Sequence, residues 1–332
     1  MIPSHRIAST TRRGLALAAL ALFGFAGTAR AQTPTAWPLK PVRIVVGFAP
    51  GGGTDVMARN VAQALTSALG QPVIVDNKPG ASGNISVSEV SRAVPDGYTF
   101  LIGPTTIETA NPSLFKSSVA PARDLTPVGT VGRTQMYLIA KPQIAATSIK
   151  ELVALAKARP DTLSFASSGT GTAPHLACEL FKQVTGTSIT HVPYRGSSPA
   201  LMDVMSGQAD FVCDPGIAFP HIRAGTVKLL GVVSSRRSPF FPDVPTVSEQ
   251  GFPGANLDIW FGLWAPNGVA PDILARMNRE LAKALAQPAL KAHYAELGAE
   301  PVAMDTAEFR KLLADETRQL TTLIRDQKIT VD

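Results

Sequence analysis

Glycine, serine and threonine cluster in several short loops that could bind an anion through backbone and hydroxyl groups. The first loop, within GFAPGGGTDVMAR at residues 47–59, places three consecutive glycines between an apolar run and a helical pattern. Glycines let the backbone approach a ligand closely, and the free N–H groups at the start of a helix attract negative charge. The loop therefore favours binding of a phosphate or a carboxylate, and the simpler alternative is a tight strand-to-helix turn.

The known nucleotide-binding motifs do not fit this loop. A Walker phosphate loop needs a lysine directly after its last glycine, but Gly53 is followed by Thr54 and Asp55, and the next lysine is Lys78. A dinucleotide fingerprint needs GxGxxG, and GFAPGGGTD has a different spacing, although Asp76 lies at about the distance expected for the acidic residue. The spacing argues against a nucleotide-binding fold.

Catalytic and metal-binding patterns are also absent from the sequence. There is no GxSxG elbow, and no spacing specifies a triad of Ser167, His175 and Asp214. The five histidines and two cysteines form no HxxxH, HExxH or CxxC pattern, so we expect no metal and no cofactor. We therefore expect no enzymatic activity. An exported α/β hydrolase or lyase acting on a small carboxylate is the alternative.

The N-terminus has the parts of a secretory signal peptide. Arg12 and Arg13 precede the apolar stretch GLALAALALFGFAG, and small residues allow cleavage before Gln32. Residues 1–31 are therefore predicted to be removed on export, by the Sec route or, given TTRRGLAL, by the twin-arginine route. No later window approaches 18 uncharged apolar residues. We expect the mature protein in the periplasm.

The charge of the mature chain excludes one class of partner. The whole chain has 31 basic and 25 acidic residues, and the leader holds four of the basic ones and no acid. The mature chain therefore has 27 basic and 25 acidic residues, a formal charge of about +2. With no basic block and only three Trp and four Tyr, the sequence lacks the electrostatic footprint of nucleic-acid binding.

Two cysteines, Cys178 and Cys213, leave two interpretations open. An exported protein can hold a disulfide, but sequence alone does not place the two Cα atoms. Both residues stand among apolar neighbours, which is also typical of buried free thiols.

Strand-like and helix-like segments alternate after a proline-rich linker at residues 32–41. A first set of segments predicts strands at 42–48, 71–77 and 97–103, with helices at 54–69 and 84–94. A second set predicts strands at 136–140, 162–168, 190–196, 211–214 and 228–235, with helices at 148–160, 174–186 and 198–208 and a helical turn at 218–225. A strand at 257–266 and helices at 271–286 and 306–325 follow. This alternation predicts βαβ units and a parallel sheet.

Further loops rich in small hydroxyl residues follow strands in both halves of the chain. They are NKPGASGN and GPTT in the first half, and SSGTGTAPH and YRGSSPA in the second. In open parallel sheets, ligands bind outside the carboxyl ends of the strands. If each half forms its own sheet, the two sets of loops can face each other across a cleft. Several helix N-termini around a small space describe a receptor for a small carboxylate.

From about Trp37 to Arg325, the chain resembles the Bug-type extracytoplasmic solute receptors of tripartite tricarboxylate transporters. The resemblance rests on nine motifs in order: WPLKPVRIVVGFAPGGGTDVMAR, LGQPVIVDNKPGASGNI, PDGYTFLIG, NPSLF, SSGTGTAPHLACELF, HVPYRGSSPALMDVMSGQADF, IRAGTVKLLGV, VPTVSEQGFPG and WFGLWAPNGVAP. It implies an α/β clamshell of the periplasmic binding protein type II-like class, with two doubly wound α/β domains around a ligand cleft.

The resemblance also implies an organisation and partners. Domain 1 would comprise residues 37–134 with 257–332, and domain 2 residues 135–256. The receptor would be a monomer that delivers its ligand to a membrane permease with a large and a small subunit. The ligands implied are di- or tricarboxylates, aromatic carboxylates or acidic amino acids, and nothing in the sequence selects among them. A receptor that signals to a membrane sensor would use the same cleft.

Eighteen residues match the carboxylate-facing positions of that family. They are Phe48, Ala49, Gly52, Gly53, Asp55, Ser82, Asn84, Thr105, Thr106, Ser167, Ser168, Gly169, Thr172, His175, Tyr194, Arg195, Gly196 and Asp214.

Several of these residues have a structural alternative. Asp55 could serve only the start of its helix, and Arg195 could brace a loop through a salt bridge. Tyr194 could pack at a hinge, and Phe48 could form a wall of the cleft. Asp214 would repel a carboxylate but pair with an ammonium group, unless it only caps a turn.

Overall fold

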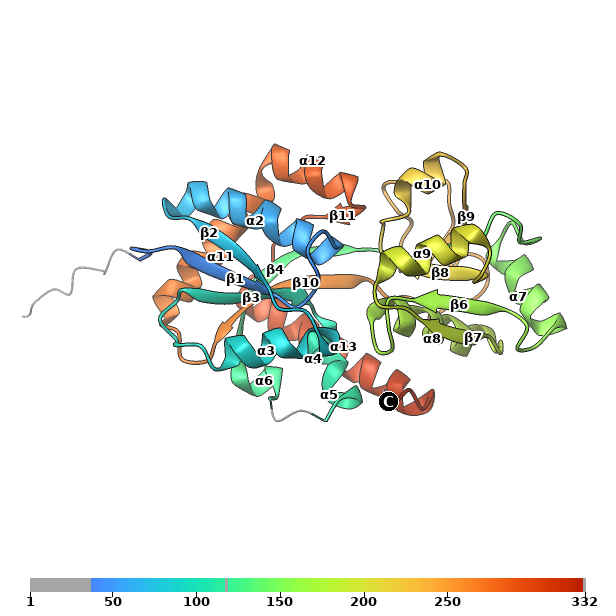
Figure 1. Ribbon diagram of the computed structural model, residues 1–332, viewed down its shortest axis with the longest axis horizontal. Coiled ribbons are helices and arrows are strands. Elements are labelled where there is room, and N and C mark those ends of the chain that lie inside the picture. The colour runs from blue at the N-terminus through green and yellow to red at the C-terminus, as the bar shows by residue number, and fades with distance from the viewer. Residues whose placement is uncertain (1–36, 117–118, 331–332) are drawn as a thin grey trace, which may run out of the picture. The chain divides into compact units, whose positions relative to one another are not determined.

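The computed structural model describes residues 37–116 and 119–330 (Figure 1). The predicted signal peptide and most of the proline-rich linker lie outside the described residues. Within the described part of the chain, the helices are too short or too polar to cross a bilayer.

The strands form two sheets. The six-stranded sheet has the order β11 (Ala299–Glu300), β4 (Leu125–Thr134), β10 (Ile259–Pro266), β3 (Thr99–Pro104), β1 (Val42–Val46) and β2 (Val73–Asn77). The five-stranded sheet has the order β7 (Thr190–Pro193), β6 (Ser164–Ser167), β8 (Phe211–Asp214), β5 (Tyr137–Ala140) and β9 (Lys228–Val232).

Both sheets are mixed, which corrects the predicted parallel arrangement. β1 pairs in parallel with β2 and β3, and β6 pairs in parallel with β7 and β8. However, β10 runs antiparallel to β3 and β4, and β5 runs antiparallel to β8 and β9. Alternation with helices predicts only the βαβ units. It does not predict the direction of strands that reach a sheet from the other sheet.

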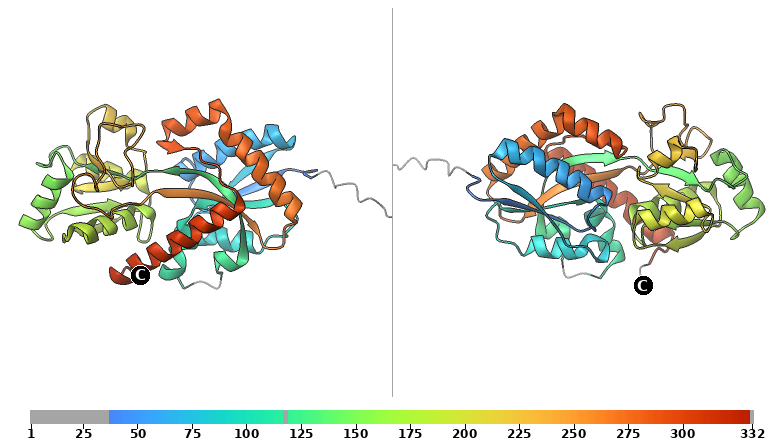
Figure 2. Two further views of the ribbon diagram at one scale, coloured as in Figure 1. Left: turned by 180° about the vertical axis from the view of Figure 1, so that it is seen from behind. Right: turned by 45° about the horizontal axis from the view of Figure 1, so that its top comes forward.

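Helices cover both faces of the six-stranded sheet (Figures 1 and 2). On one face lie α2 (Gly53–Leu69), α11 (Pro271–Ala286) and α12 (Pro288–Glu296). On the other face lie α3 (Asn84–Ser91) and α13 (Thr306–Asp326). Short segments connect these elements: η1 (Ala81–Gly83), α4 (Thr106–Thr109), α5 (Asn111–Leu114) and α6 (Pro121–Asp124).

The five-stranded sheet has its own helices and core. α8 (Ala173–Thr185) and α9 (Ser197–Ser206) pack on its strands, and α7 (Ile149–Ala158) and α10 (Phe219–Arg223) complete this part. Tyr137 and Phe219 meet edge to face in its core, with ring centroids 4.9 Å apart. A separate core beneath the first sheet contains Trp264 and Phe309. Each sheet therefore buries its own apolar face.

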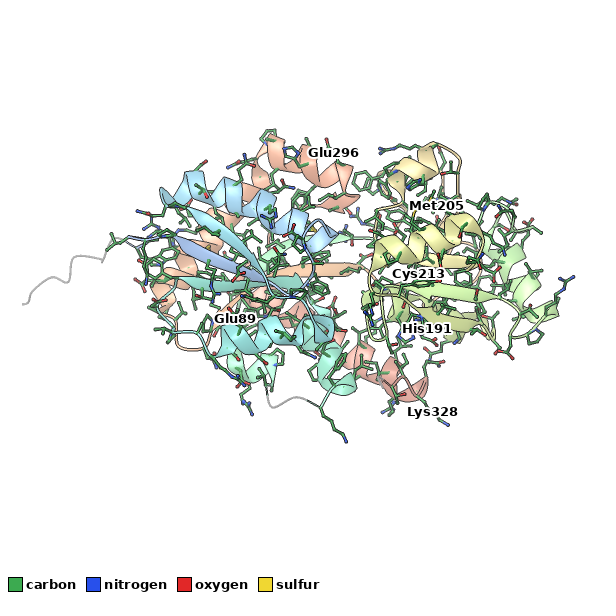
Figure 3. The ribbon with its side chains drawn as sticks, in the orientation of Figure 1. Glu89, His191, Met205, Cys213, Glu296 and Lys328 are labelled. Atoms are coloured by element: carbon green, nitrogen blue, oxygen red, sulfur yellow. The ribbon has the colours of Figure 1, made fainter. Side chains whose placement is uncertain are left out.

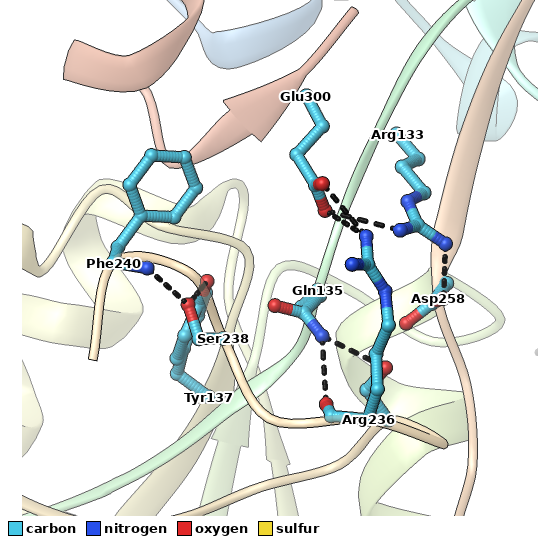
Figure 4. A network of polar contacts seen from close by, with 9 residues as sticks. Arg133, Gln135, Tyr137, Arg236, Ser238, Phe240, Asp258 and Glu300 are labelled. Atoms are coloured by element: carbon cyan, nitrogen blue, oxygen red, sulfur yellow. Dashed lines mark hydrogen bonds and ion pairs between the residues drawn. The ribbon is translucent and has the colours of Figure 1, made fainter. Parts of the chain in front are cut away.

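The chain passes between the two sheets twice, from β4 to β5 and from β9 to β10. The predicted domain boundaries, 134/135 and 256/257, fall in these two connections and stay predictions. Polar contacts join the connections (Figure 4). Gln135 Nε2 donates to the carbonyl of Arg236 over 2.9 Å, and Arg236 pairs with Glu300 over 2.7 Å. Arg133 also pairs with Glu300, over 3.2 Å, and with Asp258, over 3.4 Å.

Candidate functional site

The glycine loop after β1 is held in place by the side chain of Asp55. Only 2% of Asp55 is exposed. Its carboxylate accepts hydrogen bonds of 2.9 Å from Gly51 N–H, Asn77 Nδ2 and Arg59 Nε. Asn77 Nδ2 also donates to the carbonyl of Phe48 over 3.0 Å. The carboxylate of Asp55 therefore bonds to groups within the protein, and these bonds fix the loop that leads into α2.

These contacts set the charge of Asp55. Burial alone would raise the pKa of its carboxyl, but the hydrogen bonds from Arg59, Gly51 and Asn77 outweigh burial and hold the pKa below its ordinary value. Asp55 is thus ionised at neutral pH, and Arg59 offsets its charge at the start of the helix.

The start of α2 presents free donors to solvent. Gly52 is the N-cap, and its carbonyl accepts the first intrahelical hydrogen bond, from Val56 N–H over 3.0 Å. The N–H groups of Gly53 and Thr54 precede that bond and have no acceptor within the helix. Ala49, Gly52 and Gly53 are all exposed. This end of α2 therefore has the geometry of an anion-binding helix N-terminus.

The second predicted loop lies directly against the first. A Cβ atom at Gly47 would lie 2.7 Å from the Cα atom of Gly83. A Cβ atom at Gly83 would lie 3.6 Å from the ring of Phe48. Phe48 is half-buried. Glycine at both positions allows the two loops to touch.

Backbone strain is concentrated in this second loop. Ala81 and Ser82 have φ angles of +47° and +52°, which side chains rarely adopt. Asn111 holds the turn, because its Nδ2 donates to Ser82 O and to Asn84 Oδ1, each over 3.0 Å. Strain that the surrounding structure maintains is concentrated at binding sites in proteins. Ser82 and Asn84 are half-buried beside the glycine loop.

The two threonines after β3 have different environments. Thr105 is buried, and its N–H and hydroxyl both donate to Trp260 O, over 2.8 and 3.3 Å. Its hydroxyl is therefore used within the fold. Thr106 begins α4 and is half-buried. A Cβ atom at Gly83 would lie 3.1 Å from Ile107 Cγ2, so α4 adjoins the Ser82 turn.

The loop after β6 is closed by its own hydrogen bonds. Ser168 Oγ donates to Thr172 Oγ1 over 3.0 Å, and Thr172 Oγ1 donates to Gly169 O over 2.7 Å. Tyr194 N–H donates to Ser167 O over 3.0 Å, which joins this loop to the loop after β7. The four predicted loop residues Ser167, Ser168, Gly169 and Thr172 therefore lie together.

Two stacked histidines form hydrogen bonds with residues of this loop. The rings of His175 and His191 lie 3.9 Å apart, and Gly171 N–H donates to His175 Nδ1 over 3.0 Å. His191 Nε2 lies 2.7 Å from Ser167 Oγ. Burial lowers the pKa of His191 to about 4, and the neighbouring His175 adds to this effect. In the tautomer with its proton on Nδ1, a neutral His191 ring can accept a hydrogen bond from Ser167 Oγ at Nε2.

These contacts place the side chain of His175 inside the protein. Its Nδ1 accepts from the loop, and its Nε2 lies 3.6 Å from Glu179. Sequence reasoning missed His191, because a lone histidine in a predicted strand gives no signal. Ser167, His175 and Asp214 do not hydrogen-bond to one another, and Ser167 is fully buried. The geometry therefore forms no triad from these three residues.

The loop after β7 offers one charged side chain to solvent. Tyr194 is half-buried, and its hydroxyl donates to Asp203 over 2.7 Å. Burial and the Asp203 carboxylate raise the pKa of Tyr194 to about 12. Arg195 is exposed and makes no ion pair with the described residues. Gly196, at φ +136°, is the N-cap of α9.

Asp214 caps a turn at the end of β8. Its Oδ1 accepts from Gly216 N–H over 2.7 Å and from Ala218 N–H over 3.0 Å. Its Oδ2 is buried without a hydrogen-bond partner, and burial raises the pKa of the carboxyl to about 6. Only 1% of the residue is exposed. Asp214 therefore caps a turn, which is the structural alternative to pairing with a ligand ammonium group.

The predicted site residues thus form two groups. The first lies around the start of α2, in the loops after β1, β2 and β3, and the second lies in the loops after β6 and β7 and at the end of β8. Among the described residues, no hydrogen bond or ion pair joins the two groups. Likewise, no group of three His, Cys, Asp or Glu side chains in residues 37–116 and 119–330 could hold a metal ion.

This fold is a type II-like clamshell of the periplasmic binding proteins. The periplasmic binding protein BugD has a TM-score of 0.80 at 34% identity, over 89% of this chain and 100% of its own. R. palustris Rpa4515 with adipate gives 0.83 at 34% identity, with the same coverage. MatC from Rhodopseudomonas palustris with bound malate gives 0.78 at 31% identity, over 87% of this chain and 100% of its own.

Sequence comparison identifies the family. Residues 57–329 match the tripartite tricarboxylate transporter family receptor, TctC. The Bordetella pertussis protein BugT is 36% identical over 319 residues, which cover 93% of this chain and 96% of BugT. The chain belongs to the tripartite tricarboxylate transporter receptor family.

Proposed function

We propose that this protein is an exported solute receptor that binds a small dicarboxylate and delivers it to a tripartite tricarboxylate-type membrane transporter. Membership of the receptor family supports the transport role. Related proteins at 34% and 31% identity have adipate and malate bound, and both are dicarboxylates. The receptor would bind and release its ligand unchanged, as a periplasmic monomer.

The exposed start of α2 is the observation that carries this proposal. Gly52 and Gly53 are exposed, the N–H groups of Gly53 and Thr54 have no acceptor within the helix, and Asp55 fixes the loop by accepting the N–H of Gly51. One ligand carboxylate would accept hydrogen bonds there. The strained turn at Ser82 lies beside it, held by Asn111. At this end of the ligand, neutral donors would bind the carboxylate without a fixed counter-charge.

Arg195 is our candidate for the second carboxylate. It is the one charged side chain among the predicted site residues that is exposed and has no ion-pair partner among the described residues. In the proposed clamshell, closure would bring the loops after β6 and β7 towards an anion at α2. The two connections between the sheets, joined by Gln135 and Arg236, would act as the hinge.

The energetics are compatible with this assignment. A dissociation constant in the micromolar range corresponds to a favourable binding free energy of about 8 kcal/mol. Charge-assisted hydrogen bonds contribute roughly 1.5 to 3 kcal/mol each, so five or six would suffice after the entropy cost of association.

Isothermal titration of the mature chain, from residue 32, with adipate and malate tests the proposal. The protein is first unfolded and refolded to remove any ligand that it acquired from the host. We expect saturable binding to one site and recovery of unchanged ligand by mass spectrometry. Arg195→Gln should weaken binding of a dicarboxylate more than of the matching monocarboxylate. Turnover of the ligand, or no binding to any acid of a di- and tricarboxylate panel, would contradict the proposal.

A further inference from the structure

The fold brings together the two cysteines of the chain. Cys178 lies in α8 and Cys213 in β8, 35 positions apart, and their Sγ atoms are 2.7 Å apart (Figure 3 labels Cys213). Both side chains are fully buried. α8 packs directly on β8, so the contact belongs to the core of the five-stranded part. The two Sγ atoms are thus already neighbours, so a small movement of the side chains would bring them to bonding distance.

We propose that the exported protein carries a disulfide bond between Cys178 and Cys213. This proposal rests on the export that is part of the proposed function, because a periplasm maintains disulfides and a cytoplasm does not. The bond would link the helix that follows the Ser167 loop to the strand that ends at Asp214. It would thus fasten two ligand-side loops to each other.

The bond must form before the core closes. The thiols are inaccessible in the fold, and burial beside Cys213 raises the pKa of Cys178 well above its ordinary value. A thiolate is the attacking species, so oxidation belongs to the folding chain. The oxidant is the disulfide of a thiol oxidoreductase. One cysteine attacks that disulfide, and the other cysteine then displaces the oxidoreductase. The receptor gains one S–S bond, while the oxidoreductase takes up two electrons and two protons as a dithiol.

The structure suggests what the bond stabilises. His175 precedes Cys178 by one helical turn, and its ring accepts the N–H of Gly171 in the loop. Fixing α8 at Cys178 therefore restrains the loop through His175. The bond also closes a segment of 35 positions, which removes conformational freedom from the unfolded chain.

Alkylation and intact-mass measurement test the proposal directly. The protein is exported with its leader, purified, unfolded in guanidinium and treated with iodoacetamide, with or without prior reduction. We expect no alkyl group without reductant and two after reduction. Uptake of two groups without reductant would overturn the proposal. The mature chain made in a reducing cytoplasm and kept with reductant is the control, and it should take up two groups in both cases.

A second measurement tests the effect on stability. The oxidised chain should melt roughly 5 to 10 °C above the reduced chain. A double variant, Cys178→Ala with Cys213→Ala, should melt at the same temperature from either compartment. Equal melting of the oxidised and reduced native chains would contradict the stabilising role. If the double variant fails to fold, the alkylation result on the native sequence still decides whether the bond exists.

Titration of the same preparations with adipate and with the di- and tricarboxylate panel separates this proposal from the proposed function. Free thiols together with intact adipate binding would overturn the disulfide alone. A disulfide in a protein that binds no carboxylate would overturn the receptor function alone.

Discussion

A negative charge introduced at Gly53 should weaken binding of an anion without lowering the stability of the fold. Gly53 is the first residue of α2, and a Cβ atom there would have no neighbour within 4 Å. Its φ lies outside the left-handed region, so other residues fit the backbone. Gly53→Asp therefore adds a carboxylate beside the proposed anion without a steric clash. Gly53→Asn is the matched control, since it has nearly the same shape and no charge.

The expected magnitude follows from Coulomb repulsion. Two unit charges about 5 Å apart near a protein surface repel by roughly 2 to 3 kcal/mol, at an effective dielectric constant of about 20 to 30. Gly53→Asp should thus weaken adipate binding by about 30- to 150-fold relative to Gly53→Asn. An acid in the first turn interacts favourably with the helix dipole, so the melting temperature of Gly53→Asp should equal or exceed that of the control.

Isothermal titration at two salt concentrations, with a melting curve for each variant, measures both quantities. The gap in affinity between the two variants should narrow as salt screens the exposed charges. Equal affinities for Gly53→Asp and Gly53→Asn would refute the assignment of the anion to the start of α2. Weaker binding that is accompanied by a large loss of stability would also count against it, because misfolding would then explain the result.

Two further experiments test the roles of the buried acids Asp55 and Asp214. Asp55→Ala leaves Gly51 N–H and Asn77 without their acceptor, so it should lower the free energy of unfolding in urea by about 3 kcal/mol. Arg59→Gln removes only the half-exposed partner of the ion pair and should lower it by under about 1 kcal/mol. Equal losses would show that Asp55 serves the ion pair and not the loop. Asp214 has a folded pKa of about 6, above the 3.8 of its ordinary state, so its contribution to stability is full below about pH 4 and is lost as the pH rises through 6. In the native protein this effect should lower the unfolding free energy by about 3 kcal/mol between pH 4 and pH 7, and Asp214→Asn should abolish that part of the pH dependence. The same pH dependence in the variant would contradict the buried position of the acid.

The sequence predicted most of the secondary structure where local patterns determine it. The strand at 42–48 became β1, the helix at 54–69 became α2 with one more residue, and 271–286 is α11 without change. These segments have strong hydrophobic periodicity or clear ends. β4 was missed because Pro127 and its glycines are unfavourable in strands, and pairing on both sides with β10 and β11 overrides that preference.

The sequence predicted the loops at the strand ends but not the directions of their side chains, and ligand binding by these loops stays a prediction. A loop begins where its strand ends, so the predicted strands also predicted the positions of the glycine loop, the Ser82 turn and the Ser167 loop. The side chains of Asp55, His175 and Asp214 instead turn into the protein. Their directions depend on partners such as Asn77, which is 22 positions from Asp55, and no local pattern contains that information.

A crystal structure of the refolded mature protein with adipate tests the central claim most directly. We predict one ligand carboxylate within hydrogen-bond distance of the N–H groups at Gly53 and Thr54, beside Ser82, with the loop after β6 closed towards it. Adipate bound elsewhere, with the start of α2 occupied only by solvent, would contradict the claim.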